Sequence, residues 1–441
     1  MEMSGKEKDF GILAMEVYFP HYYVSQTELE EFDGCQGKYT IGLGQQRMAI
    51  CPEYEDINSI ALSVLSQLMR RNNISYKNIG RLEVGTESAL DMSKSTKSIL
   101  MNLFKESGNH DVEGIDTING CYGATNALFN SLQWLESSYW DGRLAIVVAT
   151  DCAIYPSGSA RATGGCGSVA MLVGPNAPLV LKPPRGSFMD HVYDFYKPTL
   201  RTNSYPIVDG KLSVYCYMKA MHLCYVSFKT KYEKMHSRKI CLLDEFDYIV
   251  FHSPYSKIVS KAFSRLLLFD AKMNDIEDTK LSETQSSLLS LYGSMTDEEI
   301  YNRFSDESQL NKICKDEFTK YTKLSNYLTK QLGNLYTGSV YISILSLLMQ
   351  FSSNKKQSNI LVFSYGSGCA SSMFSITQKD IPSIPKLSSI EDKLNSRISL
   401  SPEKYLAHIS QLSNQHNSHF IPSTPSIMEP NAYYLQKIED Y

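Results

Sequence analysis

The chain has 441 residues, a length that suggests two large units or a duplicated fold. Hydrophobic residues make up 43% of the sequence and charged residues 20%, as in ordinary soluble globular proteins. A net charge of −4 at pH 7 argues against nucleic acid or an anionic membrane as the main partner.

The N-terminal segment and the cysteines bear on the compartment. Residues 1–9 are polar and mixed in charge, unlike a secretory signal or an arginine-rich transit peptide. The apolar stretches are far shorter than a membrane span. The ten cysteines include no C-x-x-C pair and no tight spacing with histidine, so we expect no metal site. A cytoplasmic protein with free thiols fits these features.

The first predicted module is a strand followed by a helix. A short strand is expected over residues 81–86, and residues 93–104 carry apolar side chains at helical spacing. Glu87 follows the strand, so it is presented on a loop between two ordered elements. Taken alone, such a residue is more often a solvated acid near a helix start.

A second module surrounds Cys121. A β-branched strand pattern ends at small residues before it, and an amphipathic helix is expected over residues 124–137. Unpaired amides and the dipole at a helix start favour an anion, so this position suits a reactive thiolate. Gly120 and Gly123 keep side chains away from the sulfur, which would let a thioester oxygen reach backbone N–H groups. A buried structural cysteine at a strand–helix corner is the other open interpretation.

Strands and helices continue to alternate along the chain. Buried strands are expected over residues 144–149 and 168–173, and a strand over 248–251 leads into His252 and a further helix. The last modules are an apolar helix that runs to Leu348 and a strand over residues 360–364. This alternation predicts a layered α/β fold with polar residues gathered at one edge of the sheets.

Three regions stand apart from this pattern. Residues 270–326 are polar with weak periodicity and are expected to form peripheral helices and loops. Residues 182–184 look like a loop variant. From residue 377 onward, proline and serine punctuation and a patch between His416 and His419 suggest a surface layer.

Several strings in the sequence closely resemble eukaryotic hydroxymethylglutaryl-CoA synthases. They are LEVGTES at 82–88, CYG at 121–123, WDGR at 140–143, ARATGG at 160–165, YDFYKP at 193–198, YPIVDGKLS at 205–213, FHSPY at 251–255, GNLYT at 333–337 and SYGSG at 364–368. Their order and spacing match the family from about Gly11 to the C-terminus. The resemblance implies a thiolase-like fold of two similar layered αβαβα halves with peripheral insertions, and a homodimer.

The resemblance also implies a division of the chain. Residues 1–190 would form an N-terminal half that carries Glu87 and Cys121. Residues 191–380 would form a C-terminal half with the polar insertion 270–326, and residues 381–441 the surface layer. The C-terminal half would carry His252, Asn334 and Ser367.

The implied reaction condenses acetyl-CoA with acetoacetyl-CoA and water to give 3-hydroxy-3-methylglutaryl-CoA and CoA, in the mevalonate pathway. Cys121 would carry the acetyl group, because a thioester acidifies the adjacent methyl group. Glu87 would take the methyl proton, since burial raises the pKa of a carboxyl group toward the working pH. His252 would hydrogen-bond the carbonyl that becomes an alkoxide and supply a proton, although it could equally be a loop residue bonded to backbone. The thioesters are substrates, and no cofactor is implied.

Further residues are implied in substrate binding. Asn334 would contact the acetoacetyl carbonyl and Ser367 the acyl-CoA, although both could be turn formers. Lys257 and Lys261 would meet the phosphates of coenzyme A, although lysines one helical turn apart usually mark an exposed face. The remaining expected binding residues are Ser159, Thr163 and Ser213.

The sequence departs from the family pattern in places. Gly120, Ala124 and Ser159 stand where alanine, glycine and asparagine are common, and none of these changes removes a reacting group. The loop at residues 33–38 is one residue shorter than in the animal enzymes, which leaves its substrate contacts open.

Two other functions remain open. Another thiolase-fold condensing enzyme would pair its cysteine with histidine or asparagine and would lack the VGTE string that contains Glu87. A catalytically dead acyl-CoA-binding homologue would have no need to retain Glu87, Cys121 and His252.

Overall fold

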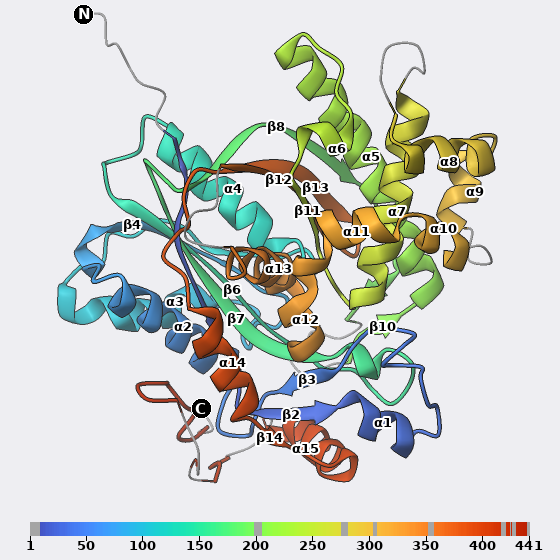
Figure 1. Cartoon of the computed structure of the whole chain (residues 1–441). Coiled ribbons are helices and arrows are strands. Elements are labelled where there is room, and N and C mark those ends of the chain that lie inside the picture. Colours follow the sequence, from blue (N-terminus) through green and yellow to red (C-terminus); the bar gives the residue numbers. More distant parts are fainter. Residues whose placement is uncertain are drawn as a thin grey trace, which may run out of the picture.

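Nine strands form one mixed sheet in the computed structural model (Figure 1), in the order β11-β12-β13-β8-β1-β7-β6-β4-β5. The structure describes residues 9–197, 205–274, 281–302, 307–351, 357–415, 420–423, 425 and 429–438. The strands of the sheet are β1 (Gly11–Tyr18), β4 (Ile79–Gly85), β5 (Asp116–Thr117), β6 (Leu144–Ala153), β7 (Gly165–Gly174), β8 (Leu179–Met189), β11 (Tyr248–Phe251), β12 (Ser358–Gly366) and β13 (Ala370–Gln378).

The sheet has two parts that meet at a short pairing of β1 with β8, where Gly11 and Ile12 lie opposite Val180 and Leu179. One part is β1, β7, β6, β4 and β5, and the other is β8, β13, β12 and β11. Strand β8 pairs with β13 along its length, so it lies with the strands of the expected C-terminal half. The division of the chain at residue 190 stays a prediction.

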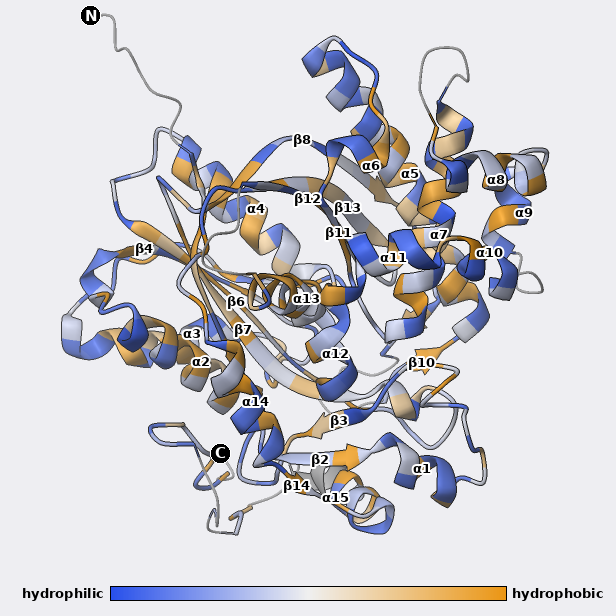
Figure 2. Cartoon of the chain, in the orientation of Figure 1, coloured by the Kyte–Doolittle hydropathy of each residue, from blue (hydrophilic) through white to orange (hydrophobic). Residues whose placement is uncertain are grey.

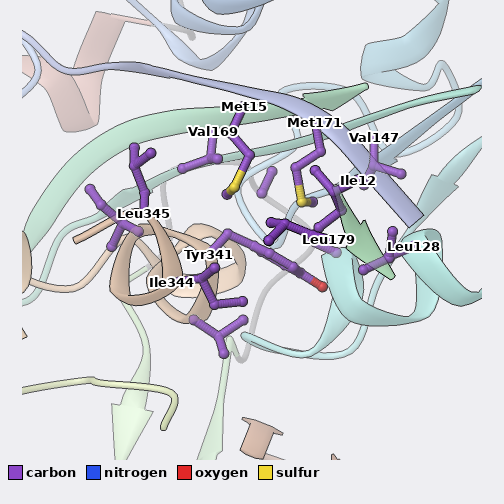
Figure 3. Close-up of a cluster of buried hydrophobic side chains, with 14 of the residues drawn as sticks. Ile12, Met15, Leu128, Val147, Val169, Met171, Leu179, Tyr341, Ile344 and Leu345 are labelled. Atoms are coloured by element: carbon purple, nitrogen blue, oxygen red, sulfur yellow. The ribbon is translucent and has the colours of Figure 1, made fainter. Parts of the chain in front are cut away.

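Two helices, α4 (Gly123–Glu136) and α13 (Ser339–Leu348), lie between the two parts of the sheet. Their buried side chains meet residues of both parts in a single core, one region of which is drawn in Figure 3. Among these, Leu128 of α4 and Tyr341 of α13 pack with Met171 of β7. Every residue of α13 is buried, which explains its apolar sequence.

Other helices cover the two outer faces. Helices α2 (Ile57–Arg71) and α3 (Thr96–Leu100) pack on the first part of the sheet. Helices α5 (Gly210–His236) and α7 (Ser256–Met273) pack on the second part. The layers therefore run helix, sheet, helix, sheet, helix across both parts together, which agrees with the expected thiolase-like layered α/β fold. Figure 2 shows hydrophobic residues concentrated along β4 and α13 and hydrophilic residues on outer helices such as α1 (Gln26–Phe32).

The polar insertion forms peripheral helices, as predicted. They are α8 (Glu283–Tyr292), α9 (Asp297–Asn302), α10 (Glu307–Ile313) and α11 (Lys315–Tyr321). Their few apolar side chains, such as Leu288 and Leu310, pack into the core around α7. These helices add to one outer layer without interrupting the central ones.

The C-terminal segment joins the N-terminal one. Strand β14 (Ile398–Ser399) pairs in parallel with β2 (Tyr22–Ser25), which pairs with β3 (Arg47–Ile50) in a separate small sheet. Helices α14 (Leu387–Asn395) and α15 (Pro402–Gln415) flank it (Figure 1). The patch between His416 and His419 lies outside the described residues. The remaining α-helices and strands of the described residues are α6 (Leu242–Glu245), α12 (Tyr327–Leu332), β9 (Phe195–Tyr196) and β10 (Ile207–Val208).

The stretch at residues 182–184 is not the loop that we expected. Strand β8 continues through it, and the register with β13 skips both prolines, so that Lys182 lies opposite Ser375 and Arg185 opposite Phe374. A bulge suits proline, which has no N–H to donate to a neighbouring strand. The prolines are therefore accommodated inside the strand.

In the described part of the chain, none of the helices is both long and apolar enough to span a membrane.

Candidate active site

A cavity of about 270 Å³ lies where loops from both parts of the sheet converge. Eight of the ten predicted site residues line it: Glu87, Cys121, Ser159, Thr163, Ser213, His252, Asn334 and Ser367. They come from loops that follow β4, β6, β11 and β12, from the turns before α4 and α13, and from the first turn of α5. The fold thus brings together residues that are up to 280 positions apart in sequence.

Glu87 and Cys121 face each other across this cavity. The thiol of Cys121 donates a hydrogen bond to Oε1 of Glu87, with a sulfur-to-oxygen distance of 3.5 Å. Burial raises the pKa of Glu87 to about 7, as expected for a carboxyl group that acts as a base near neutral pH.

The expected thiolate is not the resting form of Cys121. Burial, and next the neighbouring Glu87 carboxylate, raise the pKa of its thiol well above the ordinary value. Helix α4 begins two residues later, at Gly123, so the sulfur precedes the first helical turn. The effect of the helix dipole on the thiol is therefore outweighed by burial and a negative neighbour.

The two glycines beside Cys121 are needed for close packing. Gly120 has a φ of +50°, and a Cβ there would lie 3.1 Å from the backbone nitrogen of Ser367. A Cβ on Gly123 would lie only 2.4 Å from the carbonyl oxygen of Thr117. Both positions thus let the cysteine turn approach neighbouring backbone, and Gly120 also lines the cavity.

Asp151 supports Glu87, a role that no sequence pattern predicted. It is fully buried near the end of β6, and its Oδ1 accepts hydrogen bonds from the backbone N–H of Glu87 and the hydroxyl of Ser88, both at 2.8 Å. Its Oδ2 accepts from the hydroxyl of Thr337 at 2.5 Å. Burial raises the pKa of Asp151 to about 6. The one sequence signal was an acid inside an otherwise apolar strand.

His252 is buried in the cavity wall with both ring nitrogens unpaired among the described residues. Its carbonyl accepts a hydrogen bond from the Tyr217 hydroxyl at 2.7 Å, which fixes the backbone. Burial lowers the pKa of the imidazole to about 3, so the ring is neutral at physiological pH. A neutral imidazole can still donate its single N–H to a ligand carbonyl, so the expected role of His252 stays a prediction.

Asn334 is held by its side-chain oxygen. Its Oδ1 accepts from the backbone N–H of Tyr336 at 2.9 Å and from the hydroxyl of Ser339 at 2.7 Å. The amide group at the other end of the side chain is a donor, and the residue lines the cavity. Ser367 also lines the cavity, and its carbonyl accepts a hydrogen bond from the side chain of Asn119 at 3.2 Å.

The turn that carries Ser159 and Thr163 is braced by the loop at residues 33–38. The Thr163 hydroxyl donates to the carbonyl of Ala160 at 2.7 Å, which closes the turn. Arg161 forms an ion pair with Asp33. The loop therefore supports the cavity from outside, and none of residues 33–38 is among those that line it.

The two lysines of α7 do not line the cavity. Lys261 forms an ion pair with Glu307 at 2.6 Å, and Glu307 also pairs with Arg265. The backbone N–H of Lys257 donates to the carbonyl of Leu43, a residue at the cavity edge, at 2.9 Å. Lys257 is thus the better placed of the two for a ligand that extends outward.

Three aromatic residues that the sequence analysis did not single out form another wall. Tyr155, Phe195 and Tyr336 make mutual edge-to-face contacts with ring centroids 5.9–6.5 Å apart. Lys197, close to Phe195, donates from Nζ to the carbonyl of Glu87 at 2.6 Å. An aromatic wall keeps part of the cavity apolar beside the acid, and this agrees with the raised pKa of Glu87.

Two family models match nearly the whole chain. The model of the N-terminal part of hydroxymethylglutaryl-coenzyme A synthase matches residues 6–178, and that of its C-terminal part matches residues 180–441. The chain belongs to the hydroxymethylglutaryl-CoA synthase family.

Individual relatives agree with this assignment. The chain is 45% identical to the mitochondrial hydroxymethylglutaryl-CoA synthase of Homo sapiens, with 98% of this chain and 88% of the relative covered. It is 45% identical to the cytoplasmic synthase of Gallus gallus, with 98% and 86% covered. The solved structure of MvaS in complex with 3-hydroxy-3-methylglutaryl coenzyme A superposes with a TM-score of 0.83 at 27% identity, over 98% of both chains. Synthases of this family are acyl-transferring condensing enzymes with the thiolase-like fold.

Proposed function

We propose that this chain is a hydroxymethylglutaryl-CoA synthase that condenses acetyl-CoA with acetoacetyl-CoA and water to give 3-hydroxy-3-methylglutaryl-CoA and CoA. The observation that carries the proposal is the contact of Glu87 with Cys121 in a cavity that also holds His252 and Asn334. A nucleophile, a base and two hydrogen-bond donors are the groups that this reaction needs.

Acetylation of Cys121 is the first step. The thiol proton passes to the Glu87 carboxylate as the sulfur attacks the carbonyl of acetyl-CoA, since Oε1 of Glu87 accepts the thiol's hydrogen bond. The bond from the acetyl carbon to the coenzyme A sulfur breaks, and that sulfur takes the proton from Glu87. The enzyme then carries an acetyl thioester beside a carboxylate.

Carbon–carbon bond formation is the second step. Glu87 removes a proton from the acetyl methyl group, and the resulting carbanion attacks the ketone carbon of acetoacetyl-CoA. The new alkoxide is stabilised by the imidazole N–H of His252, whose ring nitrogens have no partner among the described residues, and by the side-chain amide of Asn334. The alkoxide takes up the proton that Glu87 removed, and water then hydrolyses the thioester to release the product from Cys121.

The finer properties of the enzyme are also proposals. Ser159, Thr163, Ser213 and Ser367 bind the acyl-CoA substrates in the cavity, and Lys257 and Lys261 meet the phosphates of coenzyme A outside it. The enzyme works without a cofactor, as a homodimer, in the cytoplasm, and binds neither nucleic acid nor membrane. The relatives include both cytoplasmic and mitochondrial proteins.

A product assay tests the proposal. Purified protein with a chelator and both thioesters should consume acetoacetyl-CoA only when acetyl-CoA is present. Mass spectrometry should identify one 3-hydroxy-3-methylglutaryl-CoA for each acetoacetyl-CoA consumed. Cleavage of acetoacetyl-CoA by free CoA, with no six-carbon product, would instead identify a thiolase.

A further inference from the structure

Three cysteines from three separate segments of the chain meet outside the cavity. Cys51 follows β3, Cys152 lies in β6 and Cys166 lies in β7, and their sulfur atoms all lie within 4.8 Å of one another. The sulfur atoms of Cys152 and Cys166 are only 2.9 Å apart. The sequence did not predict this cluster, because three separate segments contribute one thiol each.

The backbone geometry suits a bond between Cys152 and Cys166. The two residues lie directly opposite each other on adjacent antiparallel strands. Opposed residues of such strands have Cα atoms roughly 4.5–5.5 Å apart, inside the range of roughly 4.4–6.8 Å that disulfides bridge. Two sulfur ligands of a tetrahedral zinc ion would sit roughly 3.8 Å apart, so the observed 2.9 Å favours a direct sulfur–sulfur bond.

The environment makes Cys152 the nucleophile of the cluster. It is partly exposed, whereas Cys51 and Cys166 are buried. Hydrogen bonds from the thiols of Cys166 and Cys51 lower the pKa of Cys152, whereas burial, and next the hydrogen bond with Cys152, raise the pKa of Cys166. A thiolate on the partly exposed Cys152 would thus face two thiols, an arrangement found in peroxide-sensitive sites.

We propose that Cys152 and Cys166 form a reversible disulfide when the protein meets a peroxide. The Cys152 thiolate attacks hydrogen peroxide, forms a sulfenic acid and releases hydroxide. The Cys166 sulfur then attacks the sulfenic sulfur, a sulfur–sulfur bond replaces the sulfur–oxygen bond, and water leaves with the thiol proton. The two sulfur atoms together lose two electrons, which reduce the peroxide, and a dithiol reverses the bond by exchange.

The disulfide would act on the support of Glu87. Cys152 follows Asp151 directly, and its backbone N–H donates to the hydroxyl of Ser88 at 3.3 Å. That hydroxyl donates to Asp151, which also holds the backbone N–H of Glu87. Drawing the Cys152 sulfur toward Cys166 moves this part of β6. Because a displacement near 1 Å at a reacting group can cost roughly a hundredfold in rate, we expect condensation to fall by roughly tenfold or more.

Peptide mapping of the wild-type protein tests the bond. Reduced protein is treated with one equivalent of hydrogen peroxide, its free thiols are blocked, and it is digested with trypsin without reductant. Cleavage after Arg143 and Arg161 places Cys152 and Cys166 on separate peptides. The expected result is a linked pair of these peptides that dithiothreitol separates. Three results would overturn the proposal: Cys152 recovered blocked and unoxidised, Cys152 linked to Cys51, or one zinc ion bound per purified chain.

Matched variants test the effect on activity. Cys166→Val removes the resolving thiol, and Cys51→Ser leaves the pair intact. Peroxide should lower the activity of wild type and Cys51→Ser in proportion to the linked peptide, and dithiothreitol should restore it. After peroxide treatment, Cys166→Val should lose only as much activity as its fraction of oxidised Cys121 accounts for. The same tryptic digest measures that fraction. Equal loss in Cys166→Val and wild type would overturn the link to Glu87.

Discussion

Burial sets the protonation states of the three central side chains. It raises the pKa of Glu87 to about 7 and that of the Cys121 thiol well above its usual value, and it lowers the pKa of His252 to about 3. In the resting enzyme a thiol therefore faces a carboxyl group in partial ionisation, beside a neutral imidazole. In each case burial shifts the pKa toward the neutral form, which a partly dry cavity favours.

Substitution of Glu87 separates the two half-reactions. Glu87→Ala should still form the acetyl enzyme, because solvent can take up the thiol proton more slowly, whereas condensation should fall by roughly 10²- to 10⁴-fold. Rates of acetyl transfer and of product formation, measured on the same preparation, check this. Equal losses in both rates would contradict this separation and show that proton transfer from the thiol to Glu87 limits acetylation as strongly as it limits condensation.

The pH dependence of the condensation rate should follow the ionisation of Glu87. The base must be a carboxylate, and its pKa is raised to about 7, so the rate should rise with pH and level off above about 7. Below that pH the rate should fall about tenfold per unit, because protonation removes the base. A profile of kcat between pH 5 and 9 measures this. A rate that stays flat down to pH 5 would show that another group takes the methyl proton.

Substitution of His252 should impair only the use of the second substrate, acetoacetyl-CoA. His252→Ala removes an N–H directed at the acetoacetyl carbonyl, so acetylation of Cys121 should persist while kcat/KM for acetoacetyl-CoA falls by roughly 10²-fold or more. Because the ring is already neutral, this loss should not vary between pH 6 and 8. A loss confined to low pH would indicate that the imidazolium is the active form.

The three residues that we propose to react could be singled out from the sequence, but the residues that support them could not. Glu87, Cys121 and His252 stand at the ends of strands or starts of helices, where periodic patterns stop. Asp151 was missed because its partners come from residues 86–88 and from Thr337, which only the folded chain brings together. The same reason hid the contact of Cys51, Cys152 and Cys166.

Long amphipathic and apolar elements followed the sequence pattern closely. Helix α4 was expected over residues 124–137 and spans Gly123–Glu136, and the strand expected over 248–251 is β11. Short elements departed more from the predicted pattern. The segment after α3 is a 3₁₀ helix over Met101–Ser107, and the strand before Cys121 has only two residues, because tertiary contacts outweigh local preference in short segments.

Helix α7 gives a prediction that distinguishes its two lysines. Lys257→Ala should raise KM for both thioesters, and more so at low ionic strength, because exposed charges are screened within about 8 Å at physiological salt. Lys261→Ala should have a smaller effect, since its ammonium group already pairs with Glu307. Michaelis constants of both variants at low and high salt measure the difference. Wild-type constants for both lysine variants at low salt would show that α7 is a solvated face.

At the scale of the whole molecule, the layered fold is what assembles the cavity. The N-terminal strands carry Glu87 and the turn with Cys121, and the other part of the sheet carries His252 and Ser367. Central helices α4 and α13 pack between the two parts, so the two sets of residues are held against each other by one continuous core. The element order indicated this architecture, whereas the pairing of β1 with β8 that joins the two parts had no sequence signal.

Labelling with acetyl-CoA tests whether Cys121 carries the acetyl group. Protein is mixed with radiolabelled acetyl-CoA without the second substrate, quenched in acid and digested with trypsin. The label should approach one per chain on the peptide of residues 106–143, which contains Cys121 as its sole cysteine, and addition of acetoacetyl-CoA before the quench should discharge it. Cys121→Ala should take up no label and make no product. Label on another cysteine, or product formation by Cys121→Ala, would contradict the assignment of the acetyl group to Cys121.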